Sequence, residues 1–166
     1  MKMEINDHWD TIRHVFRAAF KSTMHCAIAT VNEDGSPHIT PIGSLVLQGK
    51  NKGFYCEEYP RTMVKNLETN QRVCVLAVNS GKWYWLRSIF RGRFAKPPGV
   101  RLMGTAGRRR KATEEETAMW LKRVQSFRPF KGYDLLWSNM TTVREITFDS
   151  FEPIRAGAMT RGLWGG

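Results

Sequence analysis

Cysteine and long hydrophobic runs are both scarce in this sequence. The chain has three cysteines, Cys26, Cys56 and Cys74, an odd number without CxxC spacing or a companion histidine at zinc-finger spacing. This pattern argues against a disulfide scaffold and a structural zinc site, and it favours a reducing compartment. No run approaches the roughly 20 apolar residues of a membrane span, and the charged segment from Met1 to Trp9 does not fit a secretory signal. We therefore expect a cytoplasmic protein without a metal centre or a membrane anchor.

Acidic residues are few relative to basic ones. Asp and Glu number 15 against 26 Lys and Arg, which gives a net charge of +11 and a pI near 10.0. Such an excess attracts polyanions, so phosphate is the expected partner chemistry, whether it belongs to a nucleic acid or to a small cofactor. Hydrophobic residues make up 42% of the chain, which is typical of a globular protein, and 166 residues is the size of one domain.

The residue patterns of several enzyme classes are missing. The sequence has no serine–histidine–aspartate arrangement with a nucleophile elbow, and no glycine-rich phosphate loop of the P-loop or Rossmann kind. The adjacent carboxylates Glu57 and Glu58 would point apart, so they do not form an acid–base pair. Hydrolase and kinase functions are therefore disfavoured, and the sequence identifies no catalytic residue.

Hydrophobic periodicity predicts an α+β fold dominated by β structure. Short strands, with one helix after the third strand and another before the last, indicate a six-stranded antiparallel split β-barrel with flanking helices. We expect the basic stretch from Arg87 to Gly99 to form a surface loop, and the run from Arg108 to Lys111 to form an exposed junction between a strand and a helix. The expected single domain, residues 1–166, consists of an N-terminal helix (1–21), a barrel core (24–107), a helix (112–127), a final strand (141–148) and a tail (156–166).

The start of a short predicted helix is the clearest local signal for a ligand. Pro60 suits the first turn of that helix, and Arg61 and Lys65 lie four residues apart on one face. Thr62 adds a hydroxyl, and the free N–H groups of a first helical turn favour an anion. These residues form a candidate phosphate site, although an ordinary solvated helix start has the same pattern.

Four motifs follow one another along the chain in a specific order. They are Ile28-Ala29-Thr30-Val31, then Gly35-Ser36-Pro37-His38-Ile39-Thr40-Pro41-Ile42, then Gly53-Phe54-Tyr55-Cys56, then Arg61-Thr62-Met63-Val64-Lys65-Asn66-Leu67. This order resembles the pyridoxamine 5′-phosphate oxidase-like family of split barrels that bind flavin mononucleotide (FMN). The family pattern is a strand, a tight turn, a strand ending in a polar-Pro-apolar step, a strand with tyrosine, and a helix with a cation and Lys-Asn-Leu. The resemblance covers residues 24–78 and, more loosely, residues 101–107.

The resemblance implies a homodimer with FMN at the subunit interface and a small-molecule substrate. Arg61, Thr62 and Lys65 would hold the phosphate. A flat ring needs an apolar slot with hydrogen-bonding groups along one edge, which a Thr-Pro-Ile-Gly-Ser segment offers. The expected activity is transfer of hydride or electrons between a nicotinamide cofactor and a small organic acceptor, and a flavin-binding role without catalysis stays open. The residues that would surround the ring are Thr40, Pro41, Ile42, Gly43, Ser44, Tyr55 and Cys56.

Other residues leave other functions open. The segment Phe151–Gly157 does not resemble the substrate-binding end of the true pyridoxamine phosphate oxidases, so vitamin B6 is not the expected substrate. Some relatives bind a deazaflavin or haem, and His25 and His38 are candidate haem ligands. The aromatic, basic segment from Trp83 to Arg87 would suit stacking on a flavin, or on single-stranded nucleic acid in a basic protein without a cofactor. No recognition-helix or zinc-finger motif supports nucleic-acid binding, which we therefore do not expect.

Overall fold

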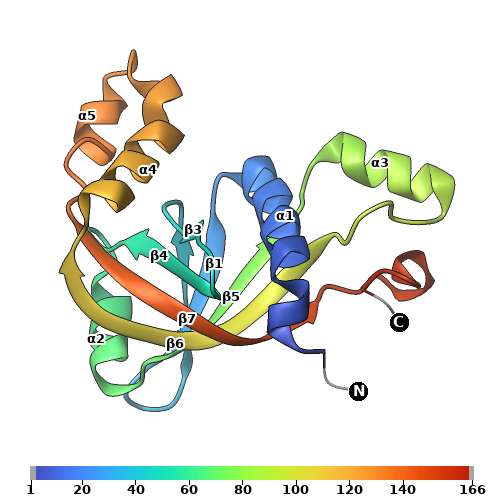
Figure 1. The fold of residues 1–166 in the computed structure, drawn as a ribbon, viewed down its shortest axis with the longest axis horizontal. Helices are drawn as coiled ribbons and strands as arrows, with labels where there is room; N and C mark the ends of the chain where they lie inside the picture. Colours follow the sequence, from blue (N-terminus) through green and yellow to red (C-terminus); the bar gives the residue numbers. More distant parts are fainter. Residues whose placement is uncertain (1–2, 165–166) are drawn as a thin grey trace.

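The computed structural model describes residues 3–164, and the ends of the two predicted terminal segments, residues 1–2 and 165–166, lie outside it. Figure 1 shows a curved sheet with α1 across it, while α3 and the α4–α5 segment project away on different sides. Within the described part of the chain, no helix has the length and apolarity needed to cross a membrane. In chain order the elements are α1 (Ile5–Thr23), β1 (Cys26–Val31), β2 (Pro37–Ile42), β3 (Val46–Leu47), β4 (Lys52–Cys56), α2 (Arg61–Thr69), β5 (Arg72–Val78), α3 (Lys82–Arg91), β6 (Gly99–Lys111), α4 (Glu114–Val124), η1 (Gln125–Phe127), α5 (Gly132–Leu136), β7 (Thr142–Pro153) and η2 (Gly157–Thr160).

The strands form one sheet of seven, in the order β2-β1-β5-β6-β7-β4-β3, and the neighbouring strands pair antiparallel. The prediction of an α+β fold dominated by antiparallel strands is confirmed, but the six-stranded barrel is wrong in two respects. The additional strand is β3, a two-residue strand that the turn after β2 brings against β4. The sheet also remains open, because within the described chain the edge strands β2 and β3 each pair with a single neighbour.

The strand β6 continues to Lys111, through the arginine run that we expected to be an exposed junction. Its last residues, from Arg109 onward, pair with the beginning of β7, which supplies ladder hydrogen bonds to this polar stretch. Arg110 also donates to both carboxylate oxygens of Glu116, at 2.7 Å each. A bidentate pair of this kind gives the cationic side chain a fixed partner at the edge of α4.

The same strand bends at two register shifts, between Met103 and Gly104 and between Ala106 and Arg109. Bulges bend a strand and increase its twist, so β6 can pair with both β5 and β7 while the sheet curves. The first bulge requires glycine, because a Cβ on Gly104 would lie 2.4 Å from the carbonyl oxygen of Thr147.

The main core lies between α1 and the sheet. An apolar stripe of α1, with helical spacing, packs across β5, β6 and β7. Met24 caps the C-terminus of this helix, and its N–H donates to the carbonyl of Phe20. The C-terminal segment joins this core through Trp164, whose ring lies 5.3 Å from that of Phe151. The buried residues of α1 are Ile5, Trp9, Ile12, Val15, Phe16, Ala19 and Phe20.

The helix α3 includes the first residues, 87–91, of the loop that we expected from Arg87 to Gly99. It includes the aromatic stretch Trp83-Tyr84-Trp85, and Gly92 ends it with a left-handed φ of 65°. The rings of Tyr84 and Trp85 pack on Phe94, with centroids 5.5 and 5.1 Å away, which holds the helix against the segment that follows it. Its other large apolar residues are 58 to 92% exposed; they are Trp83, Leu86, Ile89 and Phe90.

A second, smaller core lies beneath α4 and α5. A capping box is present at the start of α4, where Thr113 and Glu116 bond to each other's backbone N–H groups. Because Tyr55 belongs to the main core and its neighbours Phe54 and Cys56 belong to this second one, both faces of β4 are buried. The buried members of the second core are Phe54, Cys56, Trp120, Val124, Tyr133 and Val143.

A buried ion pair joins the end of β4 to β7. Glu57 and Arg144 are exposed by only 1% and 4%. Arg144 donates from Nε and Nη2 to the two carboxylate oxygens, at 2.6 and 2.9 Å, and from Nη1 to the carbonyl of Gly107 at 2.9 Å. The Tyr55 hydroxyl donates to the same carboxylate at 2.7 Å. Burial and the Glu57 charge raise the pKa of Tyr55 far above its usual value, so the phenol remains a donor.

Replacing Glu57 by glutamine should destabilise the protein by about 3 to 5 kcal/mol, because the guanidinium of Arg144 would be left buried without its counter-charge. Chemical denaturation of the parent and of Glu57→Gln measures this difference. The control is Glu33→Gln, which removes an exposed pair with Lys65 and should cost less than about 1 kcal/mol. Equal losses in the two variants would contradict the role assigned to the buried pair.

The stability contributed by Glu116 should depend on pH. The hydrogen bonds from Arg110, and then those from Thr113, hold the pKa of Glu116 below its usual value, against the effect of burial. A carboxylate with a lowered folded-state pKa stabilises above its unfolded pKa, and this contribution is lost as pH falls through the folded value. The difference in unfolding free energy between the parent and Glu116→Gln should therefore be largest near neutral pH and shrink below about pH 4.5. Denaturation curves between pH 7 and pH 3 measure it, and a difference independent of pH would refute the assignment.

Candidate functional site

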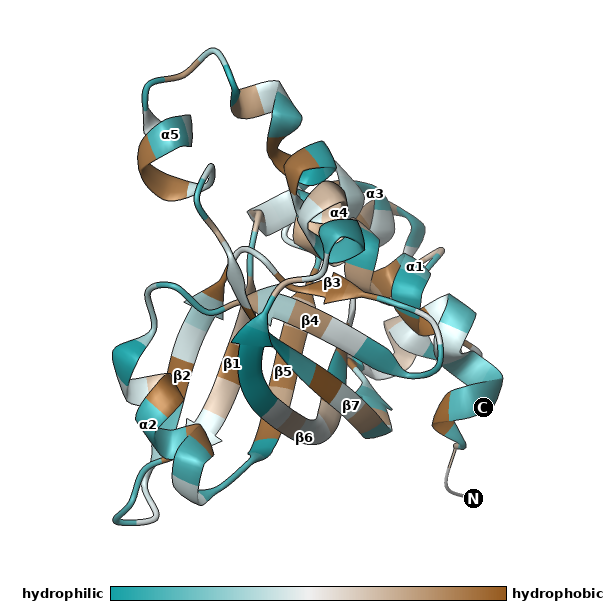
Figure 2. Cartoon of the chain, turned by 60° about the vertical axis from the view of Figure 1, so that its left-hand side comes forward, coloured by the Kyte–Doolittle hydropathy of each residue, from teal (hydrophilic) through white to brown (hydrophobic). Residues whose placement is uncertain are grey.

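A cavity of about 380 Å³ opens where β2 ends, beside the start of α2 and beneath α5. Its volume lies in the range of small-molecule sites. Six predicted site residues line it, namely Thr40, Pro41, Ile42, Gly43, Ser44 and Cys56. Six further residues complete the lining, namely Tyr59, Pro60, Trp120, Leu136, Trp137 and Met140. All twelve are uncharged, and we refer to this cavity as the slot. Figure 2 shows α5 and the loops around it above the ends of β2 and β4.

The hydroxyl of Thr40 is a polar group of the slot that has no partner within residues 3–164. Its Oγ1 atom is buried and has no hydrogen-bond partner within the described chain. A buried hydroxyl without a partner is costly, and a ligand atom that accepts or donates there would remove the cost. Neighbouring Pro41 has no N–H, and it lies on the edge strand β2, where proline is tolerated.

The turn after β2 is held tightly against the rest of the fold. The Ser44 hydroxyl accepts from the N–H of Cys56 at 2.9 Å and lies 3.3 Å from the carbonyl of the same residue. A Cβ on Gly43 would lie 3.3 Å from the carbonyl oxygen of Met24, so this position leaves little room for a larger residue. Ser44 is thus used to fix the turn, and Thr40 is the side chain in this segment that has a free hydroxyl.

The thiol of Cys56 belongs to the wall of the slot. Burial is the main reason that its pKa rises to about 12, and the contact with Ser44 opposes that rise only in part. At neutral pH the group is therefore a neutral thiol, which packs as a small apolar side chain. The neutral thiol of Cys56 is therefore suited to form part of an apolar surface against a ring, and it is poorly suited to act as a nucleophile.

Two tryptophans from the α4–α5 segment complete the slot, and sequence reasoning missed both. Trp120 is 3% exposed, and its indole N–H donates to the carbonyl of Trp137 at 3.1 Å. On the other side, the hydroxyl of Tyr59 lies 3.2 and 3.1 Å from the carbonyls of Leu135 and Leu136. These bonds join α4, α5 and the loop after β4 around one opening. No short-range pattern could reveal them, since the residues lie far from β2 in the sequence.

The predicted phosphate residues lie beside the slot, outside its lining. Arg61, Thr62 and Lys65 are exposed on the first turns of α2, and the helix begins directly after Pro60, which does line the slot. The ammonium of Lys65 is 3.5 Å from a carboxylate oxygen of Glu33. The first-turn N–H groups of a helix attract an anion. The side of the slot next to α2 therefore has the more positive electrostatic potential.

Asn66, in the same helix, holds α2 in place. It is 4% exposed, and its Nδ2 donates to Thr30 Oγ1 at 3.0 Å and to Asn32 Oδ1 at 2.8 Å. The Lys-Asn-Leu element that contributed to the resemblance is thus a structural anchor at its second position.

The structure places Tyr55 apart from the other predicted residues. Its side chain is fully buried in the main core and hydrogen-bonded to Glu57, so it does not line the slot. Strand alternation explains the difference, because Cys56 and Tyr55 are consecutive and point to opposite faces of β4.

The two candidate haem ligands lie away from the slot lining. His25 is exposed, with its Nδ1 2.8 Å from the carbonyl oxygen of Thr23. His38 lies within the edge strand β2, opposite Thr30. Across residues 3–164, no group of three or more His, Cys, Asp and Glu side chains is arranged to hold a metal ion.

Several solved structures superpose on this fold. HupZ of Group A Streptococcus superposes with a TM-score of 0.58 and 18% identity, over 89% of this chain and 96% of that one. An FMN-binding protein of Syntrophomonas wolfei gives 0.59 and 10% identity, over 90% of each chain. An F420 reductase gives 0.54 and 12%, over 82% of this chain and 95% of that one. At these identities the similarity is one of fold.

Comparison of sequences gives the family. No curated protein matches the sequence. The family model described as pyridoxamine 5′-phosphate oxidase matches residues 12–149, which include all the strands except the end of β7 and all the predicted site residues. The chain therefore belongs to the pyridoxamine 5′-phosphate oxidase family and shares the split-barrel fold of its relatives.

Proposed function

We propose that this protein is a flavoprotein that binds FMN in the slot, with the ring against residues 40–44 and the phosphate at the first turn of α2. The observation that carries the proposal is the buried, unpartnered hydroxyl of Thr40 in a slot with uncharged walls. A flavin ring has an apolar face and a polar edge, and these fit such a lining. An FMN-binding protein of the same fold supports this choice of cofactor.

The residues of the slot would bind and orient the cofactor. Thr40 would hydrogen-bond the polar edge of the ring, while Trp120 and Trp137 would cover apolar surface and exclude water. Arg61, Thr62 and Lys65, on the first turns of α2, would hold the phosphate together with the free N–H groups of the first turn. Bound FMN would supply the transfer of hydride or electrons between a nicotinamide cofactor and a small organic acceptor.

We also propose that the protein is a homodimer that completes the slot at its interface. Four large apolar residues of α3 are exposed, and apolar residues gathered on one surface element are typical of protein–protein contacts. Leu135 and Leu136 of α5 are also exposed, by 80% and 48%, and Leu136 lines the slot. A second subunit would cover such surfaces and shield the ring from solvent.

Removing the groups at the start of α2 should weaken FMN retention. Arg61→Ala and Lys65→Ala should each cost about 1 to 3 kcal/mol of binding free energy through lost charge-assisted bonds. Thr40→Val, which removes the unpartnered hydroxyl, should weaken binding while changing the protein's stability little. Dissociation constants from the quenching of flavin fluorescence measure all three effects. Lys131→Ala, an exposed cation on the α4–α5 connection, is the control.

Two outcomes would overturn the assignment. If the three variants bind FMN as tightly as the parent, the slot is not the flavin site. If the parent retains no FMN and shows a single sharp Soret-type band after addition of haem, the cofactor is haem.

Placing a charge on α3 should dissociate the dimer. Phe90 is 92% exposed in the single chain, so Phe90→Glu should leave the fold of the subunit unchanged while burying an unpaired carboxylate in the interface. Sedimentation velocity should show the parent near twice the 19.1 kDa chain mass and the variant at the mass of one chain. Ser126→Glu is the control. A monomeric parent would refute the dimer, and a dimeric Phe90→Glu would refute the role of α3.

A further inference from the structure

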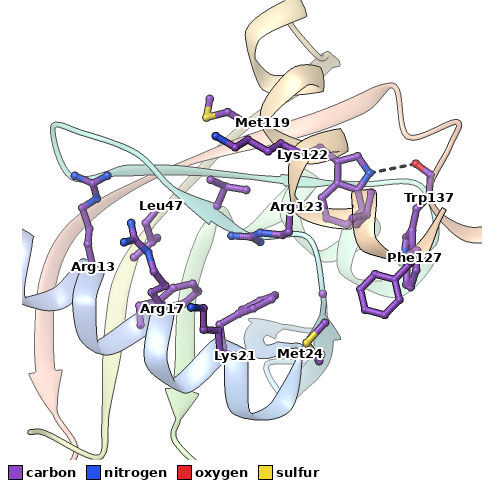
Figure 3. A pocket seen from close by; sticks show the side chains of 16 residues that line it. Arg13, Arg17, Lys21, Met24, Leu47, Met119, Lys122, Arg123, Phe127 and Trp137 are labelled. Carbon is purple, nitrogen blue, oxygen red and sulfur yellow. Dashed lines mark hydrogen bonds between the residues drawn. The ribbon is translucent and has the colours of Figure 1, made fainter. Parts of the chain in front are cut away.

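A second cavity, larger than the slot, lies between α1 and α4. Its volume is about 810 Å³. The aromatic rings of Phe16, Phe20 and Trp120 contribute to its floor, together with Leu47 from β3. We refer to it as the α1–α4 cavity, and Figure 3 shows it from close by.

Five cations line this cavity, and none of its lining residues is acidic. In Figure 3 the side chains of Arg13, Arg17 and Lys21 rise from α1, and Lys122 and Arg123 extend from α4 toward them. Like charges gathered around one cavity repel each other, so an anion that enters it would be attracted by them and would reduce this repulsion.

The position of Arg123 is fixed at the bottom of the cavity. Its Nη1 donates to the carbonyl of Leu45 at 2.6 Å, and its guanidinium lies 4.7 Å from the centre of the Phe20 ring. Burial, together with the charge of Arg17, lowers its pKa. A half-buried guanidinium with one hydrogen bond to a protein carbonyl, and with no carboxylate among the residues that line the cavity, keeps donors available for an anion.

Arg13 shows the same deficit of partners. Its Nε is buried and makes no hydrogen bond within residues 3–164. The Nη1 of Arg13 forms an exposed ion pair with Asp10 at 3.8 Å, a distance too long for a hydrogen bond, and this pair leaves Nε without an acceptor in the described chain. A buried N–H without an acceptor is an uncommon and costly feature, which a ligand oxygen would relieve.

We propose that the α1–α4 cavity binds a small amphiphilic anion, that is, a bulky apolar body with an anionic head group such as a carboxylate. The apolar floor would take the body, and the guanidinium groups of Arg13, Arg17 and Arg123 would take the head. The cavity adjoins the slot, because Gly43, Trp120 and Trp137 line both. The proposal goes beyond flavin binding and does not depend on it.

Electrostatics and shape favour a small ligand over a macromolecule here. A second copy of this chain, with its net charge of +11, would be repelled by five cations that have no carboxylate among them. A nucleic acid backbone would neutralise the rim but leave the apolar floor uncovered. An amphiphilic anion satisfies both the rim and the floor.

The test uses a matched pair of probes, 2-naphthoate and the neutral 2-naphthalenemethanol, titrated by isothermal calorimetry into the full chain without flavin. Naphthoate should bind about tenfold or more tightly than the alcohol, because both fill the floor and only one pairs with the guanidinium groups. Raising the salt concentration should reduce this preference. Equal affinity for the two probes, or no binding of either, would overturn the proposal.

Variants locate the binding to this cavity. The double variant Arg17→Gln/Lys21→Gln changes two exposed residues of α1, so folding should be preserved, and the affinity for naphthoate should fall about fivefold or more. Lys131→Gln and Arg155→Gln, at exposed positions outside the lining, are the controls and should bind like the parent. Naphthoate binding unaffected by the double variant would contradict the assignment. Because Thr40→Val should leave naphthoate binding unchanged, failure of the flavin site and failure of this cavity can be told apart.

Discussion

The bidentate ion pair between Glu57 and Arg144 is the constraint on which the rest of the site depends. A carboxylate and a guanidinium buried this deeply are tolerated only when their donors and acceptors have partners, and Tyr55 and the Gly107 carbonyl provide further ones. Because Glu57 directly follows β4, the pair fixes the point at which the chain leaves the sheet. The loop from that point leads through Pro60 into α2. A buried pair of charges thus positions a slot whose own lining is uncharged.

The two cavities are built on one shared wall. Residues of the turn after β2 are held on one side by the Ser44–Cys56 contact and on the other by the close approach of Gly43 to α1. The helix α4 contributes to both hollows, through Trp120 and through Arg123, which reaches the carbonyl of Leu45. The slot therefore offers an apolar surface and a free hydroxyl, while its neighbour offers cations. A ligand in either one would lie against the same turn.

The sequence grouped residues that one segment brings together, but it did not reveal which distant segments join them. Residues 40–44 and Cys56 do line one slot, because the short turn after β2 brings Ser44 against the backbone of Cys56 at the end of β4. Tyr55 was predicted to surround the ring, but its side chain lies in the main core. Because α4 and α5 cover the second face of β4, both faces of this strand are apolar, and no alternation of polar and apolar residues shows which side chains point to the slot. The expected loop begins as the end of α3, which continues to Arg91. The run from Arg108 remains in the sheet, because β7 pairs with it and Glu116 binds Arg110. Both outcomes depend on contacts between distant segments.

The β6–β7 ladder closes the α4–α5 segment at its base. Lys111 and Thr142 pair directly, so residues 112–141 leave the sheet and return to it at adjacent points, whatever they do in between. The entropy cost of closing such a segment grows only slowly with its length. Arg144 of β7 also joins the two strands that carry it, because it donates to the carbonyl of Gly107 in β6. A change in the length or the side chains of the α4–α5 segment therefore need not disturb the pairing of β6 with β7, while it would alter the side chains at the slot and at the α1–α4 cavity.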